Sequence, residues 1–445
     1  MSDTLFFDFI FSHYSEYLIY AFISCMLCYL AVRRLAVGIL DPIHFYFTFS
    51  FGTSYAVVFI LWIYNYISSY LFGMIALNFI FLYLSMALAY KIKRFRLTGF
   101  SDYFFKTAEK NTKITFTIIA LIYIFLTVIY IKSVSFDAFI QSRFEANKGL
   151  GALVRILDVI RLMLTAYLAI KFFETKGFKR FIYIILALSI SIFASFVSGA
   201  KASLLEHVLV MLIALYISKG WRPKFNFRFA FVGCILSVCL ISYVLFMLQF
   251  TSEAIGYTKS QYINGPVEIE LFLLRIFANA DMYYFSLPNG VIDRLHVGSS
   301  IGQLFGYIIG NGGMQSIFGY DYSGNDVGRL IWKFWYPNDN IARGPTNHFD
   351  LAGYSYFGYV GGIMMTMVVG WIIGRVSKAK NARRFNGYFY SCFLATLYCR
   401  ALQIFLSPSV GIAYILDILV FIVFIFVISE LIAILFRSIV SPIHE

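Results

Sequence analysis

Seven cationic side chains outside the basic loops carry the strongest chemical signal in this sequence. They are Arg143, Arg155, Arg161, Lys201, Arg275, Arg343 and Arg400. We expect them at loop roots or just inside long apolar segments, and charged groups at membrane depth normally face a bundle interior or a wet cavity. Because a guanidinium matches phosphate oxygens with paired hydrogen bonds, these residues predict an anionic ligand, and a diphosphate could engage several of them.

Acid–base chemistry also has candidates near these cations. A reacting hydroxyl needs a group that takes its proton, and histidine titrates close to neutral pH. His348 is therefore the first candidate base, with Asp350, Glu206 and Asp158 as competitors. Glu206 and His207 are equally compatible with a buried hydrogen-bonded pair or a proton path.

Several of these residues have a structural interpretation as well. Arg155, Asp158 and Arg161 have helical spacing along one face, so Asp158 could simply pair with either arginine. The counter-ion of Arg400 could be a ligand phosphate or one of three carboxylates, namely Asp158, Asp350 and Asp417. Lys201 could be an ordinary loop lysine.

The elements that must hold these side chains are membrane-spanning helices. Hydrophobic residues make up 60% of the 445 residues and charged ones only 13%, whereas soluble domains carry about 25% charge. A span needs about 20 apolar residues. We predict an all-α, polytopic integral membrane protein with about 11 (10–12) spans, centred near residues 24, 53, 78, 122, 164, 189, 211, 240, 360, 395 and 424. Residues 5–12 are too short to span and predict an interfacial segment or the start of a twelfth helix.

Orientation follows from six basic clusters, because short basic loops stay in the cytoplasm. These clusters hold 23 of the 36 basic residues and lie at residues 33–34, 91–113, 171–180, 219–228, 375–384 and 437. Each follows an odd-numbered span, which predicts an external N-terminus and a cytoplasmic C-terminus. The net charge of +13 is then mostly a topology signal, so we expect the lipid bilayer, and no nucleic acid, as a partner.

One long external loop, residues 251–345, interrupts the single domain that we assign to residues 1–445. It holds 13 of the 31 glycines together with Trp332 and Trp335, a mixture that suits a partly ordered cap over a ring-shaped ligand such as a glycan. Residues 268–285 predict an amphipathic helix with Arg275 and Asp281 near one face. A surface helix with a solvated Arg275 is the alternative.

The six cysteines all fall within predicted spans, at spacings that resemble no metal site. We expect no disulfide, no metal and no cofactor.

Three segments together resemble the O-antigen polymerases, the Wzy-type polymerases of oligosaccharide repeat units. They read SGAKASLLE, LLRIFANADMYYF and PTNHFDLAGYSYFGYVGG. The resemblance implies an all-helical fold like the class-B GT-C glycosyltransferases and metal-independent transfer between undecaprenyl-diphosphate-linked glycans. It also implies a bacterial inner membrane protein with a periplasmic active site and, as a further partner, a chain-length regulator protein.

Carried onto this chain, the resemblance assigns diphosphate binding to Arg275 and the basic hairpin position to Lys201, where many relatives have arginine. It places the Pro-x-Asn helix entrance at Pro345 and Asn347, with Asn347 and Asp281 as glycan contacts. O-antigen ligases share the fold, so a ligase is the nearest alternative. A flippase or transporter is a third, although the charges gather at one face and no internal repeat is visible.

Overall fold

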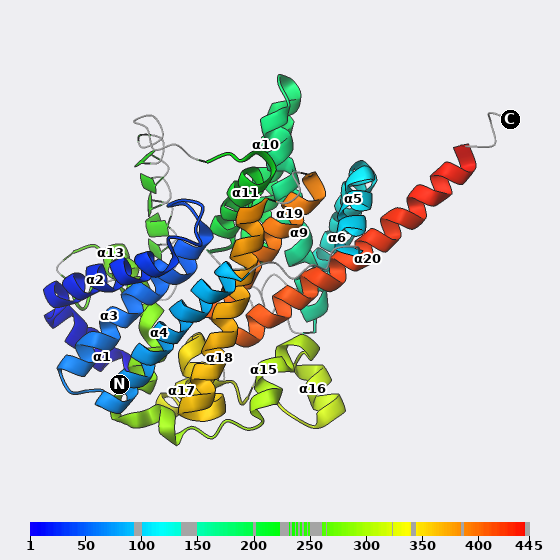
Figure 1. Cartoon of the computed structure of the whole chain (residues 1–445). Coiled ribbons are helices and arrows are strands. Elements are labelled where there is room, and N and C mark those ends of the chain that lie inside the picture. Colours follow the sequence, from blue (N-terminus) through cyan, green and yellow to red (C-terminus); the bar gives the residue numbers. More distant parts are fainter. Residues whose placement is uncertain are drawn as a thin grey trace.

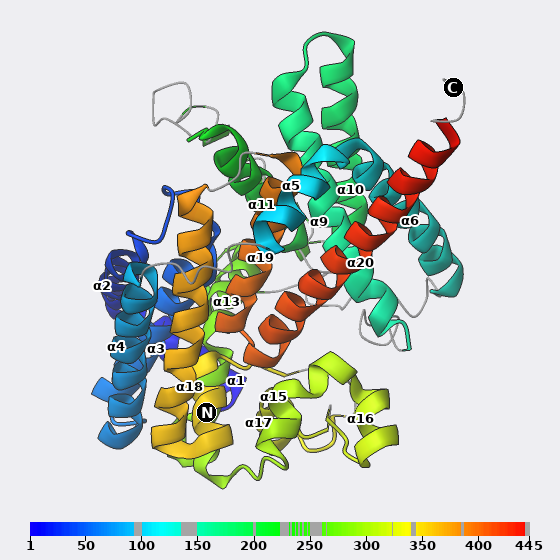
Figure 2. The ribbon, with the colours of Figure 1, turned by 45° about the vertical axis from the view of Figure 1, so that its right-hand side comes forward.

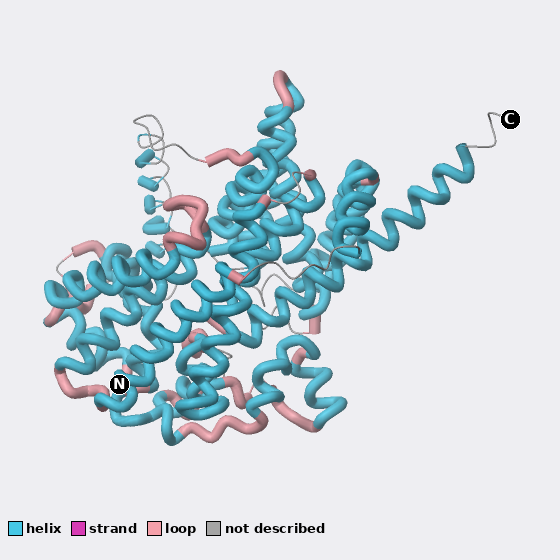
Figure 3. Tube along the Cα trace, viewed as in Figure 1, coloured by secondary structure: helices cyan, strands magenta, loops and turns pink. Residues whose placement is uncertain are grey.

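The computed structural model describes residues 1–92, 100–134, 149–198, 202–222 and 260–440, together with separate residues between 231 and 249. Within the last long range, residues 264, 323, 340–343 and 384–386 are not described. The described residues form helices joined by loops and contain no strand (Figure 3). The predicted all-α class is thereby confirmed.

Seven helices of the described residues are long and apolar enough to cross a membrane. They are α2 (Tyr14–Val32), η1 with α3 (His44–Phe49 and Ser50–Ile63), α4 (Ser69–Lys91), α6 (Thr112–Ser133), α10 (Phe178–Ser198), α18 (Phe349–Ala382) and α20 (Pro408–Val440). This supports a multi-pass membrane protein. The count of eleven stays a prediction.

Three further predicted spans are centred on helices that do not meet the same criteria of length and apolar composition. They are α9 (Gly151–Glu174), α11 (Ala202–Lys219) and α19 (Tyr388–Ala401). α9 carries five charged residues, and α19 has only 14 residues. The predicted span near residue 240 lies where only separate residues are described.

The described part of the long loop is folded into short helices. They are α13 (Val267–Phe277), η2 (Ala278–Ala280), α14 (Asp281–Ser286), η3 (Pro288–Arg294), α15 (Ser300–Ile309), α16 (Asn311–Phe318) and α17 (Val327–Trp335). We call these elements the cap. The helix predicted over 268–285 is present, but a 3-10 turn divides it between α13 and α14.

The N-terminal helix α1 (Asp3–Ser12) packs against the cap. The ring of Phe6 is fully buried and stacks on Tyr284 of α14 with centroids 3.8 Å apart. The Tyr284 hydroxyl donates to the Asp3 carboxylate at 2.8 Å. These contacts fix the start of α1 against α14 of the cap.

The cap helices α15, α16 and α17 lie at one end of the molecule, and the basic segments gather at the other (Figures 1 and 2). The turn between α9 and α10 and the C-terminal ends of α18 and α20 all lie away from α15 and α16 (Figure 2). α5 (Phe100–Lys110) joins the second group, where Phe104 packs on Phe426 of α20 with ring centroids 4.3 Å apart.

The long helix α18 connects these two ends and packs along α4. Gly370 and Gly374 permit the close approach, because a Cβ at either position would lie within 3 Å of a backbone carbonyl oxygen of α4. The Thr366 hydroxyl also donates to the Asn78 side chain at 2.5 Å. Gly358 has a φ of 69°, a conformation that costs other residues energy, and it kinks α18 on the cap side of these contacts.

Candidate functional site

A buried cluster of charged side chains joins α9, α11 and α19. At its centre lies Arg400 near the end of α19, with only 4% of its surface exposed. Its Nη2 lies 3.3 Å from the Asp158 carboxylate of α9, and its Nε lies 3.1 Å from Glu206 Oε1 of α11. The guanidinium carbon lies 4.4 Å from the centroid of the Tyr414 ring, on α20. Four helices therefore supply the surroundings of one arginine.

Arg161 extends the cluster along α9. Its Nη2 lies 2.6 Å from the other Asp158 oxygen, and its Nη1 donates to the carbonyl oxygen of Ala194 at 3.2 Å. His207 is fully buried beside the cluster, with Nδ1 2.7 Å from the Ser203 carbonyl oxygen. Its Nε2 has no hydrogen-bond partner among the described residues. A bound water or a ligand group could supply the hydrogen bond that this buried nitrogen lacks.

The second arginine of α9, Arg155, connects the cluster to the cap. Arg155 is ion-paired with Asp417 of α20 through two guanidinium nitrogens. Its Nη1 also donates to the carbonyl oxygens of Tyr307 and Ile308, at 2.9 and 2.8 Å. Because α15 ends at Ile309, these bonds satisfy carbonyls that have no partner within the helix.

The cluster is balanced in charge. Three arginines, Arg155, Arg161 and Arg400, face three carboxylates, Asp158, Glu206 and Asp417. The predicted ion pair of Asp158 with a neighbouring arginine is present. Asp158 is also a counter-ion of Arg400, which was one of the carboxylates considered for that arginine from the sequence. A diphosphate at this site would have to share or displace these carboxylates, or draw on cations from elsewhere.

His348 and Asp350 lie in a separate, aromatic environment at the start of α18. The His348 ring lies between Phe51 and Tyr283, with centroid distances of 4.8 and 5.1 Å. Asp350 accepts hydrogen bonds from the Tyr283 hydroxyl at 2.8 Å and the Tyr55 hydroxyl at 3.2 Å. These phenols stabilise the carboxylate and tie α18 to α3 and the cap.

The surroundings of His348 disfavour its predicted role as a base. Burial lowers the pKa of this histidine to about 3, whereas an efficient general base titrates near the working pH. Among the described residues its Nδ1 has no hydrogen-bond partner.

Asn347, Trp332 and Trp335, which were predicted to contact a glycan, form hydrogen bonds within the protein that hold the cap together. Asn347 donates to Asp326, at the start of α17, and accepts from the Gly328 amide at 2.6 Å. Trp332 Nε1 donates to Asp339 at 2.8 Å, and Trp335 Nε1 donates to the Phe285 carbonyl oxygen at 2.9 Å. Both indole N–H groups are thus engaged within the cap.

Arg275 and Asp281 lie on two separate helices, because the 3-10 turn η2 divides α13 from α14. Arg275 is exposed, whereas Asp281 is half-buried and accepts a hydrogen bond from the Met282 amide at 2.7 Å. Burial raises the pKa of Asp281 to about 8 and, more weakly, that of Asp326 to about 6. The exposed arginine remains available to a ligand. The candidates Arg143, Lys201 and Arg343 lie outside the described residues.

An apolar groove of about 370 Å³ lies between α18 and α20, and α15 contributes Leu304 to its wall. It is lined by apolar side chains and one glycine: Leu304, Phe357, Gly361, Met364, Met365, Val368, Val369, Ile372, Ile404, Pro408 and Ile412. Residue spacing alone gave no sign of this groove, because its walls come from segments far apart in the sequence. The contact of the Tyr414 ring with Arg400 was missed for the same reason.

The fold and these sites define a multi-pass helical membrane protein with a buried ionic cluster beneath a helical cap. Comparisons with protein-family models, with curated proteins and with solved structures gave no match to this chain. Among the described residues, no group of three or more histidine, cysteine, aspartate or glutamate side chains is arranged to hold a metal ion.

Proposed function

We propose that this protein is a glycosyltransferase of a bacterial inner membrane. It polymerises oligosaccharide repeat units carried on a polyprenyl diphosphate, and the reaction takes place on the side of the membrane where the cap lies. One observation carries the proposal. The ionic cluster and the apolar groove share α15 and the first turns of α20, so a diphosphate near Arg400 could continue into an isoprenoid chain held in the groove.

The groove suits a lipid tail because its lining is apolar and partly open. Met364 and Val368 keep 64% and 58% of their surface exposed, and they belong to a helix apolar enough to span the bilayer. An isoprenoid chain that enters sideways from the bilayer would cover this surface without leaving the lipid phase.

In the proposed reaction, the hydroxyl oxygen of the acceptor glycan attacks the anomeric carbon of the donor. A new C–O bond forms, and the bond from that carbon to the diphosphate breaks with its electron pair. Arginines stabilise the charge that develops on the leaving diphosphate. The hydroxyl proton passes to a carboxylate, and Glu206 and Asp158 are the best-placed acceptors because each already lies beside Arg400. A diphosphate that attracts Arg400 would release one of them.

A ligase that transfers the glycan to a different acceptor is the second candidate, because the same cluster and groove would serve it. The two activities separate in proteoliposomes that contain only undecaprenyl-diphosphate-linked repeat units. A polymerase forms a ladder of longer glycans on the lipid. A ligase forms none until its own acceptor is added.

The test uses Glu206→Gln and Arg400→Lys in this proteoliposome assay, with Arg294→Lys on the exposed cap surface as the matched control. We expect each cluster variant to reduce polymer formation by about 100-fold or more, the usual effect of removing a group that acts in the transition state. The control should retain full activity. A normal ladder from both cluster variants would exclude this site. Absence of any glycan transfer by the unaltered protein would exclude the function.

A further inference from the structure

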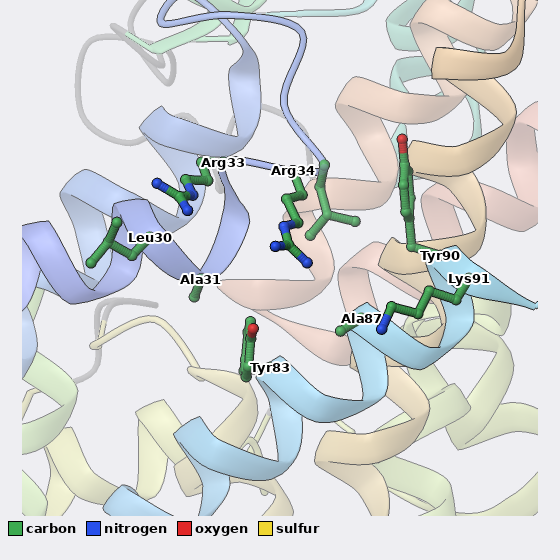
Figure 4. Close-up of a pocket in the computed structure, with 9 residues that line it drawn as sticks. Leu30, Ala31, Arg33, Arg34, Tyr83, Ala87, Tyr90 and Lys91 are labelled. Carbon is green, nitrogen blue, oxygen red and sulfur yellow. The ribbon is translucent and has the colours of Figure 1, made fainter.

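A second cavity, of about 140 Å³, lies at the opposite, basic end of the molecule between α2 and α4 (Figure 4). Its polar lining consists of Arg33, Arg34 and Lys91 with Tyr83 and Tyr90. None of the nine residues that line it is acidic. Figure 4 shows the Arg34 guanidinium and the Lys91 ammonium pointing into the space between the two helices.

The surrounding structure fixes the backbone of the turn that carries Arg33 and Arg34. The carbonyl oxygen of Leu35, next to Arg34, accepts hydrogen bonds from Lys380 at 3.1 Å and from Asn381 at 3.0 Å. Lys380 is itself fully buried and ion-paired with Asp41. The turn that carries both arginines is therefore fastened to α18, and the nearby carboxylate of Asp41 is already engaged.

The C-terminal end of α4 is satisfied by cations other than Lys91. Lys378 donates to the carbonyl oxygen of Ile92 at 2.6 Å, and Arg375 donates to the same oxygen at 3.2 Å. The helix end therefore does not need the ammonium group of Lys91. Among the described residues, no ion pair or side-chain hydrogen bond is formed by the Lys91 ammonium group.

The cavity lies at a membrane boundary. Two candidate spans, α2 and α4, end beside it at Val32 and Lys91, and a tyrosine near such an end is typical of the interface. Towards the membrane interior, the adjoining faces of both helices expose apolar side chains, among them Leu27 at 54% and Ile80 at 48%. A phosphate in the cavity would thus be continuous with a path for acyl chains.

We propose that this cavity binds the head group of an anionic glycerophospholipid from the leaflet at the basic end. The phosphate would lie between Arg34 and Lys91, with Arg33 at the rim, and the acyl chains would follow the exposed faces of α2 and α4. This lipid site is distinct from the cluster under the cap and does not depend on the proposed glycosyl transfer. Basic pockets between spans on the cytoplasmic side are a recognised way to bind such head groups.

The experiment compares lipid retention by the purified full-length protein in detergent, measured by native mass spectrometry during titration with phosphatidylglycerol or phosphatidylcholine. We expect one phosphatidylglycerol to be retained in preference to phosphatidylcholine. Arg34→Gln with Lys91→Gln should weaken its binding by about tenfold or more, since each basic residue near the membrane surface strengthens the binding of an anionic lipid.

The matched control is Lys176→Gln with Lys179→Gln, which removes the same charge at the same end, from the turn between α9 and α10 and from the first turn of α10. It should bind like the unaltered protein. Ala87→Phe keeps the cations but fills the cavity, so it should also lose the lipid. This variant still tests the proposal if the variant with two charges removed fails to fold.

Equal binding by all the variants would overturn the proposal, as would equal loss in the control. Inorganic phosphate at the same concentration should not displace the lipid. If it does, the cavity is a simple anion site and the lipid assignment is wrong.

Discussion

Arg400 illustrates how a single residue can hold several membrane helices together. Its guanidinium faces carboxylates on α9 and α11, and its own helix is α19. A buried ion network contributes little net stability when it is complete, but it is strongly destabilising when one partner is removed, because a buried charge is then left without compensation.

We therefore predict that Arg400→Met destabilises the protein by roughly 3–5 kcal/mol. A double variant that adds Glu206→Gln should recover most of that loss, because Glu206 is then neutral and Asp158 keeps its ion pair with Arg161. Thermal unfolding in detergent measures both. If the single and double variants melt alike, the pair between Arg400 and Glu206 does not hold the helices together.

His348 gives a second prediction at this scale. Its ring fills space between Phe51 and Tyr283, and its lowered pKa keeps it neutral, so packing explains its burial without proton transfer. His348→Met, which keeps an unbranched side chain of similar size, should retain most of the polymer formation. Loss of polymer from a protein that melts normally and still binds the lipid-linked substrate would instead restore His348 as the base.

Sequence patterns predicted single residues well only where neighbours in the chain decide the outcome. The pairing of Asp158 with Arg161 follows from helical spacing. The pairing of Arg400 with Glu206 joins α19 to α11 and depends on how those helices cross, which hydropathy does not specify. The environment of His348 was missed for the same reason, because Phe51 belongs to a helix that is far from His348 in the sequence.

At the scale of elements, α15 is the part of the cap that Arg155 attaches to the membrane helices. Arg155→Met removes the donors to the carbonyl oxygens of Tyr307 and Ile308, so the last turn of α15 should open more often. We expect faster amide hydrogen exchange over residues 300–309 than in the unaltered protein. Arg294→Met, on the exposed surface of the cap, is the control. Unchanged exchange in the Arg155 variant would show that other contacts hold α15.

The cap should also respond to pH through Asp281. An unfolded aspartate titrates near pH 3.9, whereas burial raises the pKa of folded Asp281 to about 8. Between these values the folded protein binds more protons than the unfolded chain, so raising the pH lowers the free energy of unfolding. The loss begins as the pH passes about 4 and is complete above about 8.

Asp281→Asn cannot ionise, so its melting temperature should fall less between about pH 5 and pH 8 than that of the unaltered protein. The matched substitution Asp293→Asn changes an exposed carboxylate of the cap. If both variants follow the unaltered protein at every pH, Asp281 is not a titrating group of the folded cap.

The helices themselves were predicted better than their interruptions. Apolar runs of sufficient length located α2, α4, α6, α10, α18 and α20, because hydrocarbon requires continuous apolar helix. The kink at Gly358 and the 3-10 turn at Ala278–Ala280 were not predicted. Both occur inside segments that read as continuous helix in the sequence, and tertiary contacts decide where the backbone departs from it.

At the scale of the whole molecule, the cap and the basic turns occupy opposite ends of one helical bundle (Figure 2). This arrangement agrees with the charge distribution in the sequence, which assigns the basic end to the cytoplasm. It also separates the two proposed sites. The glycosyl-transfer site beneath the cap would face the periplasm, and the phospholipid site would lie in the cytoplasmic leaflet.

The whole-molecule prediction is therefore one of sidedness. In a variant without its native cysteines, a cysteine at Asn325 in the cap should react with a membrane-impermeant thiol reagent in intact cells. A cysteine at Lys176, in the turn between α9 and α10, should react only after the membrane is permeabilised. Both positions must label fully in detergent, which controls for access. Labelling at Lys176 alone in intact cells would invert the protein and place the proposed transfer site in the cytoplasm, where it could not receive glycans displayed on the outer face.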